Sequence, residues 1–281
     1  MSVEPVANYH CRVGENPLWD ERTGRLLWID IETGRLFALD HRTLEHEWHY
    51  QGPVVGGVCL EENGGLLLFE ADRIARLVAG ERSVLVEGID SDMVRFNDCI
   101  ADPEGRIFAG SIGKTRESGG LYRVDRDLSV TCVWKGTGCA NGMGFTPDLA
   151  HFYWTCSTTR RIFIAGYTRE TGALSSRRVF YQAPESEGTP DGLTVDERGH
   201  VFTARWGGGA VIELDRDARI VGRIELPVPK VSSATFGGPD LDTLYVTTAG
   251  GSDGSDTADG TLYRVPLEIR GRVEFRARLL S

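Results

Sequence analysis

Short apolar stretches separated by turn residues run along the whole chain. Residues 189–204 show the unit clearly: a polar residue, a short apolar strand, an Asp/Gly turn and a second apolar strand. The ranges 121–124, 210–214 and 261–265 largely alternate apolar with polar residues, as half-buried strands do. No helical periodicity continues for a dozen residues. The pattern therefore predicts an all-β protein built from many short strands.

The same unit recurs six times along the chain. Its copies begin near Glu15, Gly56, Asn97, Asn141, Asp191 and Ser232. Subtracting neighbouring start positions gives spacings of 41, 41, 44, 50 and 41 residues, which is a period typical of propeller blades. Six repeats spread from end to end leave no room for a second core. The sequence thus predicts that residues 1–281 form a single six-bladed β-propeller domain.

Each repeat is expected to supply up to four strands. The first repeat predicts strands at 17–19, 25–30, 35–40 and 46–50, and the third predicts them at 99–101, 106–110, 120–124 and 130–134. The segment 4–12 precedes the first repeat. We expect it to pair as an outer strand of the last blade, because joining the two chain ends removes an exposed sheet edge.

Composition restricts the binding partners and the cellular compartment that we expect. The net charge of −10 disfavours nucleic acid and anionic membranes, since either would require a basic surface. No apolar run approaches the roughly 20 residues that a membrane span requires. We expect a cytoplasmic protein with neither kind of partner. The six cysteines, at positions 11, 59, 99, 132, 139 and 156, form no CxxC pair and are expected to be buried thiols in a reducing compartment.

The repeat starts predict a ring of polar side chains. The first strand of each blade lines the central channel of a propeller, so equivalent positions surround its axis. Polar residues can also simply begin strands, but Pro17 and Pro190 restrict the backbone beside Glu15 and Asp191, which favours a functional ring. Two carboxylates facing each other across a narrow channel repel unless a cation lies between them. We therefore expect Glu15, Asn141 and Asp191 to hold one divalent metal, with water completing its coordination.

The residue types at the site also restrict the identity of the metal and suggest a further site residue. An all-oxygen site with a neutral Asn favours calcium or magnesium, while zinc or manganese also fits three ligands plus water. Arg95 lies two residues before Asn97 and should emerge at the same mouth. There its guanidinium can bind hydroxyl, carboxylate or carbonyl oxygens, although an exposed surface arginine is the alternative.

Three other signals carry less weight. Residues 250–254 match the G-x-S-x-G pattern, but no helix follows, so Ser252 is not expected to be a nucleophile. His46 and His49 have the wrong spacing for a zinc helix and should be exposed on an outer strand. The loop 250–260 is expected to be either a mobile lid or a solvated connector.

Six short motifs carry a resemblance to a known family. They are 14–19 (GENPLW), 95–98 (RFND), 141–145 (NGMGF), 190–193 (PDGL), 226–230 (LPVPK) and 236–238 (FGG). In this order and spacing they resemble the family of senescence marker protein (regucalcin), gluconolactonase and luciferin-regenerating enzyme, which is a family of six-bladed propellers. The resemblance extends over nearly the whole chain.

The resemblance implies a metal-dependent hydrolase that opens a sugar lactone such as gluconolactone. It implies a divalent metal on Glu15, Asn141 and Asp191, with Asp191 also acting as the general base. It further implies that Arg95 and Asn97 contact the substrate. Two alternatives stay open, namely a calcium-binding regulatory propeller without turnover, and a phosphotriester or aryl-ester hydrolase at the same metal.

Two departures from the family pattern leave the lactone open. After Ala109-Gly110 some family members have an acidic residue, whereas the loop 111–116 of this chain has none and carries Lys114. A positive loop suits an anionic substrate, or it is simply surface. Cys156 stands where many relatives have Asp, which changes the expected floor of the pocket.

Overall fold

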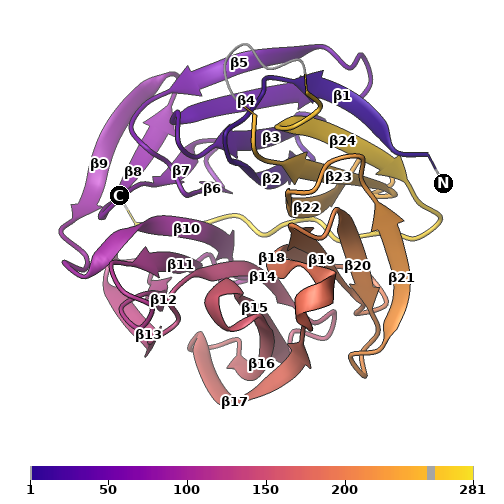
Figure 1. Cartoon of the computed structure of the whole chain (residues 1–281). Coiled ribbons are helices and arrows are strands. Elements are labelled where there is room, and N and C mark those ends of the chain that lie inside the picture. The colour runs from indigo at the N-terminus through magenta and orange to yellow at the C-terminus, as the bar shows by residue number, and fades with distance from the viewer. Residues whose placement is uncertain (1, 252–256, 281) are drawn as a thin grey trace.

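Six four-stranded antiparallel sheets surround a central axis in the computed structural model, which describes residues 2–251 and 257–280 (Figure 1). This confirms the predicted six-bladed, all-β architecture. Ser252 and the centre of the loop 250–260 lie outside the described residues. Within the described ranges the helical segments are two single turns, η1 (Ser157–Thr159) and η2 (Glu185–Glu187), and no helix is long and apolar enough to cross a membrane.

The blades follow the chain in order, and the strands of blades 1 to 5 run from the axis outward in sequence. Blade 1 is β2 (Gly14–Asp20), β3 (Arg25–Asp30), β4 (Arg35–Asp40) and β5 (His46–Gln51). Blade 2 is β6 (Gly57–Leu60), β7 (Leu66–Phe69), β8 (Arg73–Val78) and β9 (Glu81–Glu87). Blade 3 is β10 (Met93–Ala101), β11 (Ile107–Gly113), β12 (Gly120–Val124) and β13 (Val130–Lys135).

The remaining blades repeat this plan. Blade 4 is β14 (Ala140–Phe145), β15 (His151–Cys156), β16 (Arg161–Thr168) and β17 (Ala173–Gln182). Blade 5 is β18 (Thr189–Val195), β19 (Val201–Trp206), β20 (Ala210–Leu214) and β21 (Ile220–Glu225). Blade 6 is, from the axis outward, β22 (Val231–Gly237), β23 (Thr243–Thr248), β24 (Thr261–Pro266) and β1 (Glu4–Asn8).

The N-terminal strand closes the ring. Strand β1 pairs antiparallel with β24, with Glu4 opposite Arg264 and Asn8 opposite Thr261. It is therefore the outermost strand of blade 6, as the sequence predicted, and it covers an edge that would otherwise be free to pair with another chain.

Burial falls from the axis to the rim. The inner strands β14 and β22 are buried along their whole length, whereas the outer strand β5 is mostly exposed, including His46 and His49 as expected. The core lies between neighbouring sheets, where for example Phe202 of blade 5 meets Phe236 of blade 6 edge to face at 5.2 Å. Because both faces of the inner strands are covered, even their polar residues, such as Glu15 and Asp191, are buried.

The cysteines only partly follow the prediction. Positions 11, 59, 99 and 156 are buried, and all six thiols are free. Cys132 is exposed because it lies on the outer strand β13, and Cys139 is partly exposed because it opens on the central cavity. For these two the expectation of burial was wrong.

The C-terminal segment crosses the end of the channel at which the inner strands finish (Figure 1). The carbonyl of Arg270 accepts a hydrogen bond from Glu197 N, while Ala277 N and Arg278 N donate to the carbonyls of Leu60 and Gly105. These contacts fasten the segment to blades 5, 2 and 3. The opposite end of the channel, where the inner strands begin, holds the predicted site.

Candidate active site

Irregular pairing near the start of the inner strands aims the candidate side chains. Register shifts occur at 15/18 in β2, 96/98 in β10, 141/143 in β14, 190/193 in β18 and 231/233 in β22. A bulge of this kind bends the strand and turns a side chain away from its regular direction. Five inner strands thus have a bulge at the same end of the channel.

All five predicted site residues line one cavity of ≈ 270 Å³. They are Glu15, Arg95, Asn97, Asn141 and Asp191, and the other lining residues are Val13, Ile31, Ile112, Cys139, Ser157, Thr189 and Trp206. The two remaining ring positions serve packing. A Cβ on Gly56 would lie 1.8 Å from the carbonyl oxygen of Phe96, and the buried Ser232 donates to Gly14 O at 2.5 Å.

The two carboxylates that line the cavity are deeply buried. Glu15 is 3% exposed and Asp191 is 6% exposed, and neither forms an ion pair within the described ranges. Burial raises the pKa of Glu15 well above its usual value, and the charges of Asp191 and Asp98 raise it further. Burial and the charge of Asp98 likewise raise the pKa of Asp191. The charge of Arg95 lowers both pKa values only in part, so the ionised forms favour a further cation in this cavity.

The hydrogen bonds around these carboxylates come from neutral groups. Glu15 Oε2 accepts from Asn16 N at 2.7 Å, and Asp191 Oδ1 accepts from the side-chain amide of Asn141. The same amide donates to Ser157 Oγ at 3.3 Å, and its oxygen accepts from Gly142 N at 3.1 Å. Two carboxylates and a carboxamide make an all-oxygen donor set, which fits a hard divalent cation.

Arg95 is the cationic side chain at the cavity wall. Its Nη1 donates to Asn97 Oδ1 at 2.7 Å and to Phe96 O at 2.9 Å. Asn97 Nδ2 in turn donates to Ala140 O at 3.1 Å and lies 3.5 Å from Cys139 Sγ. The amide of Asn97 is thus occupied at both ends, and in this arrangement it holds the guanidinium in place.

Sequence reasoning missed several residues at the site. Asp98 and Asn16 lie just beneath the cavity and are buried, and burial raises the pKa of Asp98 to about 7. Ser157 and Trp206 line the cavity at the ends of β15 and β19. A second strand antiparallel to the first must finish where the first begins, so the residues that end second strands could have been found from the pattern. Lys114 and Cys156 are not among the lining residues.

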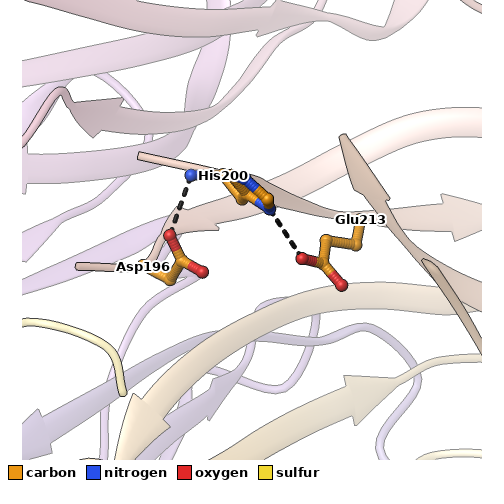
Figure 2. A group of neighbouring side chains, drawn as sticks. All are labelled: Asp196, His200 and Glu213. Carbon is orange, nitrogen blue, oxygen red and sulfur yellow. Dashed lines mark hydrogen bonds and ion pairs between the residues drawn. The ribbon is translucent and has the colours of Figure 1, made fainter. Parts of the chain in front are cut away.

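A second acidic cluster lies at the other end of β18 (Figure 2). Asp196 accepts from His200 N at 2.8 Å, and His200 Nδ1 lies 2.7 Å from Glu213 Oε1. Arg198 Nη2 lies 2.6 Å from Asp196 Oδ2 and 2.7 Å from Glu213 Oε1. Because the guanidinium already supplies the counter-charge, this cluster stabilises the turn, and a metal would have to displace Arg198.

Comparison with known proteins gives concordant matches. The family described as SMP-30/Gluconolactonase/LRE-like region matches residues 13–250. Pentonolactonase XacC of Haloferax volcanii is 45% identical, covering 99% of this chain and 98% of the relative. Regucalcin of Homo sapiens is 32% identical over 91% of this chain and 89% of the relative. A solved structure of luciferin-regenerating enzyme superposes with a TM-score of 0.90 at 26% identity and covers 99% of both chains.

Proposed function

The chain belongs to the SMP-30/Gluconolactonase/LRE-like family, and from that premise we propose that it hydrolyses sugar lactones in its central cavity. One observation carries the proposal. Glu15 and Asp191 are buried beside Asn141 in a cavity that also presents Arg95, and neither carboxylate forms an ion pair with a described residue. Such a site suits a divalent cation and has room for a small oxygen-rich substrate.

The cation is assigned to Glu15, Asn141 and Asp191, with calcium as the first candidate and magnesium, manganese and zinc as the others. Two carboxylates balance the charge of a divalent ion, and the carboxamide adds a neutral oxygen. When bound, such an ion polarises a carbonyl and stabilises the negative charge that develops on its oxygen.

Asp191 is proposed as the general base. Its carboxylate takes a proton from the water that attacks the lactone carbonyl, and it returns this proton to the ring oxygen as the carbon–oxygen bond breaks. One water is consumed, and the product is the open hydroxy acid. Within the cavity Asp191 is held by the Asn141 amide, so its orientation is fixed before the substrate arrives.

Arg95 and Asn97 orient the substrate in this proposal. The guanidinium of Arg95 has donors that are not used by Asn97 Oδ1 or Phe96 O, and these suit the hydroxyl and carbonyl oxygens of a sugar lactone. Asn97 keeps the guanidinium at the wall, because its own amide is fixed to Ala140 O. A misplaced carbonyl would lose much of the rate advantage of proximity.

The substrate class follows from size and relationship. A cavity of ≈ 270 Å³ lies below the usual range for drug-sized ligands and suits a single sugar ring. The relative in Haloferax volcanii is named a pentonolactonase. Five-carbon aldonolactones are therefore the first substrates to test, followed by gluconolactone.

A pH-indicator assay tests the proposal, because lactone opening releases acid. Chelated protein should accelerate no hydrolysis, and adding back one of calcium, magnesium, manganese or zinc should restore acid release from aldonolactones above the spontaneous rate. A panel with aryl esters and a phosphotriester separates a lactonase from the related hydrolases. Metal binding without acid release from any compound would contradict turnover and favour a calcium-binding protein.

A further inference from the structure

We propose that Asn16 is a positioning residue, which fixes the metal ligand Glu15 and the neighbouring carboxylate Asp98 in the arrangement that binds the cation. The inference rests on the proposed function, because it takes Glu15 as a ligand. Asn16 lies between Glu15 and Pro17, is 7% exposed and does not line the cavity itself.

The backbone of Asn16 is in the left-handed region, with φ 47°. Asn is one of the few residues besides Gly that adopts this conformation routinely. The conformation coincides with the register shift that follows Glu15 in β2, and it brings Asn16 N to 2.7 Å from Glu15 Oε2. The backbone of Asn16 therefore orients the Glu15 carboxylate by a direct hydrogen bond.

The side chain of Asn16 joins three blades. Its Oδ1 accepts from Val58 N in β6 at 2.5 Å, and its Nδ2 donates to Asp98 Oδ1 in β10 at 3.1 Å. Blade 2 contributes none of the residues that line the cavity. Blade 2 instead donates the backbone N–H of Val58 to the Asn16 amide. This bond fixes the amide so that its nitrogen faces Asp98.

The Asn16 amide holds the carboxylate of Asp98 beneath the proposed cation site. Asp98 is 6% exposed, and its side chain accepts hydrogen bonds from two groups, Asn16 Nδ2 and its neighbour Cys99 N at 2.7 Å. A third carboxylate near Glu15 and Asp191 serves cation binding best when hydrogen bonds fix its position. Among the described residues, Asn16 is the side-chain donor that holds Asp98.

Two single variants separate the contributions of the backbone and the amide. Asn16→Gly keeps a backbone that adopts positive φ freely and removes both side-chain hydrogen bonds. Asn16→Asp keeps an acceptor for Val58 N and places a carboxylate against Asp98. In the double variant Asn16→Asp with Asp98→Asn, a neutral amide again faces a carboxylate, so the pair has its original charge.

Calorimetric titration of the chelated full-length protein with calcium chloride measures the effect. Asn16→Gly and Asn16→Asp should each raise the Kd about 10- to 100-fold, the usual range for groups that orient metal ligands. The double variant should recover most of the Asn16→Asp loss. At saturating calcium, kcat on the preferred lactone should fall less than the affinity does.

The outcomes distinguish this inference from the proposed function. If Asn16→Gly binds calcium with the wild-type Kd while its metal-free Tm falls, Asn16 has only a structural role and the inference is wrong. If Asn16→Gly does not fold, the pair of Asn16→Asp and the double variant decides, and equal Kd values for these two would overturn it. Wild-type protein that binds no divalent ion would overturn the proposed function together with this inference.

Discussion

Strand β18 carries an aspartate near each end, and the two have opposite surroundings. Asp196, beyond the last residue of the strand, is fully buried but accepts from two backbone N–H groups and pairs with Arg198. Asp191, near the first residue, is almost as buried and has the neutral Asn141 amide as its donor. The same residue type thus forms an ion pair that stabilises the fold at one end of the strand, and at the other end it forms no ion pair with a described residue.

Blade 3 has a second buried aspartate whose carboxylate is both hydrogen-bonded and paired with an arginine. Asp102 follows β10, is 0% exposed, and accepts from Arg106 N and Nε at 2.9 and 2.6 Å and from Tyr167 OH at 2.9 Å. In these two turns the buried aspartate receives its counter-charge from an arginine of the same turn. At the cavity end, Glu15 and Asp191 form no ion pair with any described residue, and the charge of Arg95 offsets their burial only in part. A buried carboxylate without an ion-pair partner is a candidate place for a ligand.

Exchanging Asp191 or Asp196 for asparagine tests this contrast most strongly. Asp191→Asn should lower kcat/KM on the preferred lactone by about 100-fold or more, since it removes the proposed base and a metal ligand. Asp196→Asn should leave kcat/KM of the folded protein close to the wild-type value and lower only its stability. Steady-state kinetics with matched calcium would contradict the contrast if both variants lost similar activity.

Removing a buried carboxylate that is paired with an arginine should lower the free energy of unfolding and leave activity unchanged. Asp102→Ala leaves Arg106 buried without its partner, and breaking a buried pair in this way costs about 3 kcal/mol or more. Urea unfolding followed by circular dichroism measures this cost. Asp127→Ala is the matched control, because Asp127 is an exposed turn aspartate bonded to Ser129 and should cost well under half as much. Equal costs would remove the distinction between the two kinds of turn carboxylate.

The unpaired carboxylates should also make the metal-free protein sensitive to pH. Burial raises the pKa of Asp98 to about 7, and it raises the pKa values of Glu15 and Asp191 above their usual range. The folded state then binds more protons than the unfolded state above about pH 4, so stability falls as pH rises through 7. We expect the Tm in chelator to drop by about 5 °C or more between pH 5 and 8.

Calcium should reduce this slope, because the bound ion replaces the protons. Thermal melts with excess calcium should therefore be flatter between pH 6 and 8 than melts in chelator. Parallel slopes in the two series would show that calcium does not bind at these carboxylates. Glu274 contributes to the slope in chelator as well, because burial raises its pKa to about 7 and its charge raises the pKa of Asp98.

The fold was predictable because each strand and turn is encoded by a short stretch of sequence, and this pattern recurs six times. Strands 25–30, 35–40 and 120–124 were predicted with the bounds that the structure has. The inner strands β2 and β10 begin earlier than predicted, at Gly14 and Met93. Their bulges interrupt the alternation of apolar and polar residues on which the prediction depended.

The residues that line the candidate cavity were predictable, but the contacts among them were not. The offset within each repeat places Glu15, Asn141 and Asp191 together, and all three line one cavity, while their roles stay predictions. It could not reveal that Asn16 reaches Asp98 across 82 positions of the chain, or that Asn97 is bonded to Arg95. These contacts depend on how closely neighbouring blades approach at the axis, and no local pattern encodes that distance.

Calcium stoichiometry measured by equilibrium dialysis on four variants is the most direct test that the unpaired carboxylates hold a cation. The variants are Glu15→Gln and Asp191→Asn at the cavity, and Asp196→Asn and Glu213→Gln at the opposite end. We expect one ion per chain in the wild type and in the second pair, and none in the first pair. Retention of the ion by Glu15→Gln and Asp191→Asn, or its loss from Glu213→Gln, would place the metal elsewhere and contradict the proposed site.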